Sequence, residues 1–288
     1  MPTAKTNGIE ICYETFGSPD DPAMLMIMGL GMQLIAWPDE LCGMLADRGY
    51  HVIRFDNRDV GLSTWLDDAG VPAMGGDAPP PYTLSDMADD AAGLLDAVRI
   101  GAAHVVGVSM GGMIAQLLAI RHPRRVLSLT SIMSTVGGPD TVQPTEEAMA
   151  ALMSPRPANR EDAMDLAVRV RDVIGSTGFP RDIEREREMA GRAFDRAFHP
   201  AGFMRHIAAV MAAPSRAEAL GELEIAITVI HGDADTLVPV ENGHRTAAAA
   251  GVEPVIVPGM GHDLPEGAWP AITDATVSTA GEGAARTR

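Results

Sequence analysis

The 288-residue sequence contains only two cysteines, and its 22 basic residues are far outnumbered by 39 acidic ones. Cys12 and Cys42 lack the paired spacing of a metal site or a disulfide framework, so we expect two small buried apolar side chains and no metal. The net charge of −17 repels phosphate backbones and anionic membranes. These shortages argue against a metal centre, a nucleic-acid partner and a membrane surface.

Long apolar runs are also missing from the sequence. No stretch of about eighteen uncharged apolar residues occurs, so no membrane-spanning helix is predicted. Residues 1–17 lack the basic segment followed by an apolar segment that is typical of a secretory signal. We therefore expect a cytoplasmic protein, either a monomer or a homodimer.

Strand and helix patterns alternate over most of the chain. Short apolar runs predict strands over 9–17, 23–29, 50–56, 103–108, 126–133, 225–232 and 253–259. The last five runs are nearly continuous, as is typical of strands buried on both faces of a parallel sheet. Apolar residues at helical spacing predict a helix over 84–98 with Ser85 as its N-cap. The alternation predicts an α/β fold with a mostly parallel central sheet flanked by helices.

The alternation stops between residues 135 and 217, where the segments are helical and rich in Met, Arg and Glu. An all-helical insert inside an α/β domain indicates a cap, or lid. We therefore divide the chain into a core of 1–134 and 218–288 and a helical cap of 135–217. A Gly- and Pro-rich segment over 75–81 predicts a short loop.

One motif points to chemistry. In HVVGVSMGGMIAQLLAI, residues 104–120, Gly107, Ser109 and Gly111 lie between an apolar strand and an apolar helix. This arrangement is typical of a nucleophile held on a sharp strand-to-helix turn, which strains the serine backbone toward a positive φ and leaves no room for side chains at the two glycines. We expect Ser109 to be a nucleophile. The N–H of Met110, at the positive end of the helix, is expected to face a developing oxyanion.

A serine nucleophile needs a base, and the base needs a third group that fixes its tautomer. His262 follows the last predicted strand, and Asp233 and Asp235 follow the strand before it. Because parallel strands bring their carboxyl ends to one edge of the sheet, these loops can meet at Ser109. We expect His262 to be the base and Asp235, deeper in its loop, to be the acid. Asp233 is the alternative acid, although it better suits a cap of its own turn.

Two further loops are candidates for the site. A second oxyanion donor is expected from the loop after the second predicted strand, where glycines on both sides of Leu30 let the backbone fold tightly. We assign the N–H of Leu30, with that of Gly29 as the alternative. After the third predicted strand, Asp56, Arg58 and Asp59 either bind substrate or, as we favour, form ion pairs that hold the loop.

These segments resemble the α/β-hydrolase superfamily. The resemblance extends from about residue 8 to 276 outside the insert and is carried by MGLG, RFDNRDVGLS, GVSMGG, HGDADTLVP and GMGH, in that order. Within the superfamily, the sequence is similar to the aclacinomycin methylesterase-like branch. The triad and oxyanion donors of that branch fall on Ser109, Asp235, His262, Leu30 and Met110. Met28 stands where many superfamily members have a histidine, and the branch shares this departure.

The sequence therefore predicts a serine hydrolase that cleaves a small hydrophobic carboxylic ester through an acyl-enzyme intermediate, without a cofactor. Methionines and phenylalanines of the insert suit a broad apolar pocket, although the same residues also suit the core of the cap; no substrate-binding residue is assigned. Two alternatives stay open. The same triad serves carbon–carbon bond hydrolases and cofactor-free perhydrolases or haloperoxidases, and a hydrolase fold can also bind a ligand without converting it.

Overall fold

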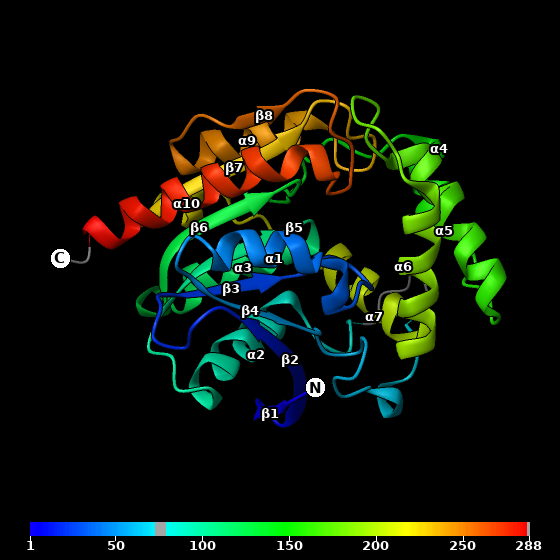
Figure 1. The fold of residues 1–288 in the computed structure, drawn as a ribbon, viewed down its shortest axis with the longest axis horizontal. Helices are drawn as coiled ribbons and strands as arrows, with labels where there is room; N and C mark the ends of the chain where they lie inside the picture. The colour runs from blue at the N-terminus through cyan, green and yellow to red at the C-terminus, as the bar shows by residue number, and fades with distance from the viewer. Residues whose placement is uncertain (73–78, 287–288) are drawn as a thin grey trace.

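The computed structural model describes residues 1–72 and 79–286, and an eight-stranded sheet forms the centre of these residues (Figure 1). The strands lie in the order β1-β2-β4-β3-β5-β6-β7-β8. Their bounds are β1 Thr3–Thr6, β2 Ile9–Phe16, β3 Ala23–Ile27, β4 His51–Phe55, β5 Ala103–Val108, β6 Val126–Ile132, β7 Ala226–Gly232 and β8 Val255–Val257. β2 is antiparallel to β1 and β4, and every other neighbouring pair is parallel.

Seven of these strands confirm the runs predicted from the sequence. β1 is not among the predicted strands, because its alternation of exposed and buried residues covers only four positions. The sequence predicted that β8 would be buried on both faces, and this prediction is wrong. This strand is at the edge of the sheet, and its three residues range from exposed Val255 to buried Val257.

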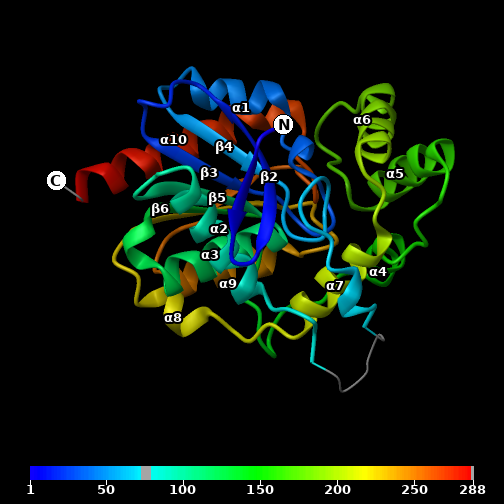
Figure 2. The ribbon, with the colours of Figure 1, turned by 90° about the horizontal axis from the view of Figure 1, so that it is seen from below.

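Helices cover both faces of the sheet. In the described residues they are α1 Asp39–Ala46, α2 Leu84–Ala97, α3 Met110–Arg121, α4 Glu146–Leu152, α5 Arg160–Ile174, α6 Ile183–Arg196, α7 Pro200–Met211, α8 Ala217–Gly221, α9 Val240–Ala250 and α10 Trp269–Arg286. α1 and α10 cover one face, and α2, α3 and α9 cover the other (Figure 2). None of the helices in the described ranges combines the length and apolar character needed to cross a membrane.

The side-chain alternation of the strands divides the core into two layers. Leu25 and Ile27 of β3 belong to the apolar cluster under α2 and α3, whereas Met24 and Met26 belong to the cluster under α1 and α10. Each layer excludes water from one face, which explains why the central strands are apolar at nearly every position. Cys12 and Cys42 are free and buried, as predicted.

The N-cap of α2 differs from the prediction. Thr83, not Ser85, precedes the helix: its hydroxyl accepts a hydrogen bond from the N–H of Asp86, and the Asp86 carboxylate accepts one from the N–H of Thr83. This reciprocal pair satisfies two backbone donors at once, whereas Ser85 already lies inside the first turn. Residues 75–78 of the predicted loop lie outside the described residues.

The segment between β6 and β7, residues 133–225, is described throughout and contains α4 to α8 without a strand. α4, α5, α6 and α7 lie together beyond the carboxyl ends of the parallel strands (Figure 1). The loops that follow β3, β5, β7 and β8 therefore face these four helices. The division into a core of 1–134 and 218–288 and a cap of 135–217 remains a prediction.

Candidate active site

Ser109 lies on a sharp turn between β5 and α3. Its φ of +56° confirms the strained backbone expected from the sequence. A Cβ on Gly107 would lie 2.2 Å from the carbonyl oxygen of Gly111, and a Cβ on Gly111 would lie 2.1 Å from that of Ile27. Only glycine fits at either position, so the two glycines allow the turn to present Ser109 at the edge of the sheet.

Three side chains from separate loops are hydrogen-bonded in series at this edge. The Nε2 atom of His262 lies 2.9 Å from the Ser109 hydroxyl, and its Nδ1 atom lies 2.7 Å from the Asp235 carboxylate. Because the carboxylate can only accept, Nδ1 carries the hydrogen and Nε2 is free to take the serine proton. The arrangement can thus turn a hydroxyl into a nucleophile.

Asp235 is held as a carboxylate in a buried position. Burial by itself raises the pKa of Asp235, but the charge of His262 and hydrogen bonds from His231, His262 and the N–H of Val238 outweigh burial and bring the pKa below its ordinary value. Its other oxygen accepts from the N–H groups of Leu237 and Val238 at 2.9 and 2.8 Å. A fixed negative charge therefore faces the side of His262 opposite Ser109.

Asp233, the alternative acid, points elsewhere. Its carboxylate accepts a hydrogen bond from the N–H of Gly259 at 2.6 Å, in the loop that follows β8. We expected Asp233 to cap its own turn, and this interpretation is wrong. The hydrogen bonds to backbone N–H groups of that turn are made by Asp235. Asp233 instead ties its loop to the loop that leads to His262.

The two backbone donors predicted for an oxyanion lie beside Ser109. Met110 is the first residue of α3. A Cβ on Gly29 would lie 3.2 Å from that of Ser109, which places the loop of Gly29 and Leu30 against the serine. Within the described residues, the N–H groups of Leu30 and Met110 donate to no other protein group. Both remain available to an oxygen that develops negative charge near Ser109.

The loop after β4 is held by buried ion pairs. Asp56 pairs with Arg196 at 2.7 Å and accepts from the N–H of Leu34. Arg58 pairs with Asp90 of α2 at 2.6 Å, and Asp59 with Arg205 of α7 at 2.7 Å. Asp56, Arg58 and Asp59 are 0%, 6% and 0% exposed, so their charges are engaged within the protein. This is the structural role favoured from the sequence, not substrate binding.

The end of α5 and the residues that follow it support the loop of His262, a role for which no prediction was made from the sequence. The N–H of His262 donates to the carbonyl of Ile174 at 2.7 Å, and the N–H of Gly261 donates to the Ser176 hydroxyl at 2.9 Å. Ser176 in turn donates to Asp263, which also pairs with Arg171. These partners lie more than eighty positions apart, and only the place of Asp263 next to His262 offered a sequence signal.

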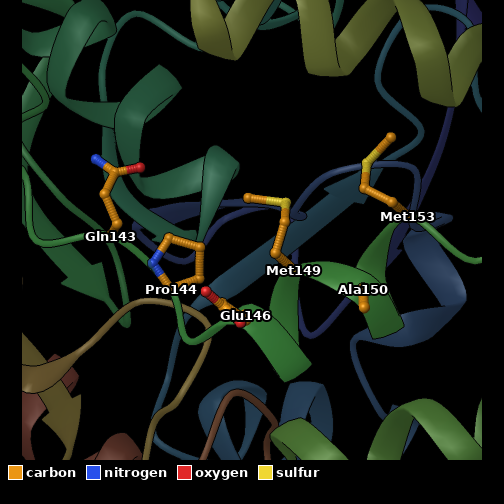
Figure 3. A pocket seen from close by; sticks show the side chains of 6 residues that line it. All are labelled: Gln143, Pro144, Glu146, Met149, Ala150 and Met153. Carbon is orange, nitrogen blue, oxygen red and sulfur yellow. The ribbon is translucent and has the colours of Figure 1, made fainter.

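An open apolar hollow of about 470 Å³ lies along α4, and Met149 and Met153 point into it (Figure 3). The residues around it are Gln143, Pro144, Glu146, Met149, Ala150 and Met153. The N–H of Thr145, at the N-cap of α4, donates to the carbonyl of Thr236. This bond ties the N-terminus of α4 to the loop of Asp235. In the described residues no group of three or more His, Cys, Asp or Glu is placed to hold a metal ion.

Comparison with known proteins agrees with this geometry. A family model described as the alpha/beta hydrolase fold matches residues 22–173. Rhodomycin D methylesterase DauP of Streptomyces sp. strain C5 is 30% identical over 292 residues, covering 92% of this chain and 93% of that protein. Rhodomycin D methylesterase DnrP of Streptomyces peucetius is 29% identical, with the same coverage.

A solved structure supports the same assignment. The enol-lactonase from Burkholderia xenovorans LB400 has a TM-score of 0.74 at 25% sequence identity, covering 98% of this chain and all of that one. The similarity to the two methylesterases, which spans nearly the whole chain, confirms the resemblance seen in the sequence motifs. With a family match over more than half of its length, the chain belongs to the α/β-hydrolase family.

Proposed function

We propose that this protein is a carboxylic ester hydrolase of the serine type. The single observation that carries the proposal is the hydrogen-bonded series from Asp235 through His262 to Ser109, with distances of 2.7 and 2.9 Å. Family membership and the methylesterase relatives support an ester as the substrate.

The residues present account for every step of ester cleavage. His262 Nε2 removes the proton of Ser109, whose oxygen attacks the ester carbonyl carbon. The N–H groups of Leu30 and Met110 bind the resulting oxyanion. His262 then protonates the leaving alcohol, and an acyl-enzyme remains on Ser109. Water, deprotonated by His262, releases the acid, while the negative charge of Asp235 stabilises the imidazolium in both halves of the reaction.

Hydrolysis of p-nitrophenyl esters tests this proposal. Wild-type protein should release p-nitrophenol from short acyl esters, and Ser109→Ala should lower kcat by about a thousandfold or more. A fluorophosphonate should add its mass to a peptide containing Ser109 in wild-type protein and not in the variant. Equal activity of Ser109→Ala and wild type would contradict the mechanism, and the absence of both hydrolysis and labelling would favour a protein that only binds a ligand.

Carbon–carbon bond hydrolysis is a second candidate. The 2-hydroxymuconate semialdehyde hydrolase of Pseudomonas sp. strain CF600 is 30% identical over 76% of this chain and 72% of that protein. A panel of methyl esters, longer acyl esters and vinylogous diketones separates the two reactions. Turnover of the diketones with kcat/KM above that of every ester would make the second reaction the principal one.

A further inference from the structure

A buried histidine joins the loop that carries Leu30 to the cap, in addition to the hydrogen bonds of Gln33 to the carbonyls of Ala193 and Ala197. The N–H of Gly31 donates to Nδ1 of His206 at 3.1 Å, although the two residues lie 175 positions apart. His206 belongs to α7 and is 0% exposed. A backbone donor next to the proposed oxyanion donor thus ends on a side chain of the cap.

The partners of His206 fix which nitrogen carries the hydrogen. Its Nε2 lies 2.9 Å from the carbonyl oxygen of Arg58, which can only accept, so Nε2 donates and Nδ1 is left as an acceptor. Burial lowers the pKa of His206 to about 4, which keeps the ring neutral at pH 7. The ring therefore bridges the oxyanion loop and the loop after β4 in a single tautomer.

The hydrogen bond from Gly31 to His206 fixes the orientation of the peptide between Leu30 and Gly31, which could otherwise rotate. The N–H of Met32 donates to the carbonyl of Gly29 at 3.2 Å, and Gly31 has a φ of +66°. This is the pattern of a type II turn, whose central peptide, between Leu30 and Gly31, rotates by half a turn in the type I form. The N–H of Gly31 belongs to that peptide, so His206 holds it in one orientation. The N–H of Leu30 lies one peptide earlier in the same turn, so fixing the central peptide also restricts the backbone rotation of Leu30.

α7 is itself fixed at this point. Arg205, the neighbour of His206, makes two hydrogen bonds of 2.7 Å to the buried carboxylate of Asp59. The ring of Phe203 fills the space above the turn, where a Cβ on Gly31 would lie 2.6 Å from it. His206 is consequently presented to the turn from a rigid support.

We propose that His206 is a positioning residue for ester cleavage: it orients the turn from Gly29 to Met32 so that the N–H of Leu30 meets the oxyanion. This inference rests on the proposed esterase function. Because the oxyanion exists only in the transition state and the tetrahedral intermediate, loss of His206 should lower kcat much more than it raises KM.

Four variants test the proposal with p-nitrophenyl butyrate as substrate and a trifluoromethyl ketone as an oxyanion-forming inhibitor. His206→Leu removes both hydrogen bonds. His206→Asn keeps an acceptor near Nδ1, and His206→Gln keeps a donor near Nε2. His104→Leu is the matched control, because His104 is a buried histidine bonded to Ser128 at the opposite end of β5 from Ser109.

His206→Leu and His206→Gln should lower kcat about ten- to a hundredfold and leave KM within about threefold, with a parallel loss of affinity for the ketone. His206→Asn should recover most of the loss, and His104→Leu should lower Tm without lowering kcat. Equal kcat for the Asn and Gln variants would overturn the proposal, even if the Leu variant failed to fold. Wild-type protein without serine-dependent hydrolysis would instead overturn the esterase function itself.

Discussion

Asp233 and Asp235 lie two residues apart in one loop, yet their carboxylates have different partners. Asp235 contacts His262 and is 5% exposed, whereas Asp233 accepts from the N–H of Gly259. An asparagine at either position is nearly the same size as the aspartate, so substitution changes charge and leaves packing intact. The pair therefore separates the chemical role of a carboxylate from its structural role.

Asp235→Asn should reduce kcat for p-nitrophenyl esters by about 10³- to 10⁴-fold, because the neutral amide neither stabilises the imidazolium nor favours the required tautomer of His262. Asp233→Asn is the control and should stay within about threefold of wild type, since the amide oxygen still accepts from Gly259. Measuring kcat of both variants, with Tm as a check of folding, shows which aspartate is the acid. A larger loss in Asp233→Asn would reassign the acid.

The neutral, buried state of His206 has a consequence for stability. Burial, partly offset by the hydrogen bond to Arg58 and the charge of Asp59, lowers its pKa from 6.5 to about 4 in the folded protein. The unfolded chain then binds this proton more tightly, so stability is lost as the pH falls from about 6.5 toward 4. The wild type should lose about 2 kcal/mol at this one site between pH 7.5 and pH 5.

Urea unfolding at the two pH values measures this loss. His206→Asn cannot titrate, so its free energy of unfolding should fall less than that of the wild type over the same interval. An identical fall in His206→Asn and wild type would show that this ring is not the source.

Some residues of the candidate site could be predicted from the sequence, and others could not. Ser109 and His262 could be assigned because each follows a strand in a local pattern with a chemical meaning. Asp235 could be preferred only by its depth in the loop. His206 and Ser176 carry no such pattern: their partners lie 175 and 85 positions away, and nothing in the flanking residues distinguishes them from the other residues of the helical segment.

At the scale of elements, the turn between β5 and α3 is the most constrained part of the chain. Gly111→Ala would push a Cβ to 2.1 Å from the carbonyl oxygen of Ile27, a backbone atom of a central strand that cannot move aside. We expect a loss of roughly 3 kcal/mol or more, or failure to fold, because the sheet and helix must separate. Thermal unfolding measures it.

Gly43→Ala is the matched substitution for this test. Gly43 lies within α1, and a Cβ there meets nothing within 4 Å. Alanine is the better helix former, so the free energy of unfolding should rise by about 0.5–1 kcal/mol. Equal effects of the two substitutions would contradict the steric account of the turn.

For helices and strands, as for single residues, a feature could be predicted when it depends on neighbouring residues and could not when it depends on distant ones. The central strands could be predicted because their burial on both faces leaves a continuous apolar run. β8 has a similar apolar run, but its place at the edge of the sheet depends on topology that no local pattern records. β1 is too short to be recognised without its partner β2.

At the scale of the whole molecule, the helical segment is bonded to three of the loops that lie around Ser109. The carbonyl of Ile174 accepts from the N–H of His262, and that of Val173 accepts from the hydroxyl of Thr236, next to Asp235. His206 accepts from the N–H of Gly31. A rigid-body opening of this segment would break all three connections and disturb the loops that carry His262, Asp235 and Leu30.

Hydrogen exchange should therefore find the helical segment closed in the free protein. The amides of Thr177 and Gly178, both bonded to the carbonyl of Gly259, and that of His262 should exchange far more slowly than unbonded loop amides. Labelling of Ser109 with a phosphonate should leave this protection unchanged. Rapid exchange at these amides, together with slow exchange in β5 and β6, would contradict a fixed segment.

The bonds between the helical segment and the loops limit how this protein could be re-engineered. Exchanging residues 135–217 for the corresponding insert of a relative is an obvious route to a new substrate range. Such a chimera would retain Ser109, Asp235 and His262 but lose the acceptors supplied by Ile174, Ser176 and His206. We expect the transplanted helices to change substrate selectivity without lowering kcat only if the graft restores these three acceptors at their present positions.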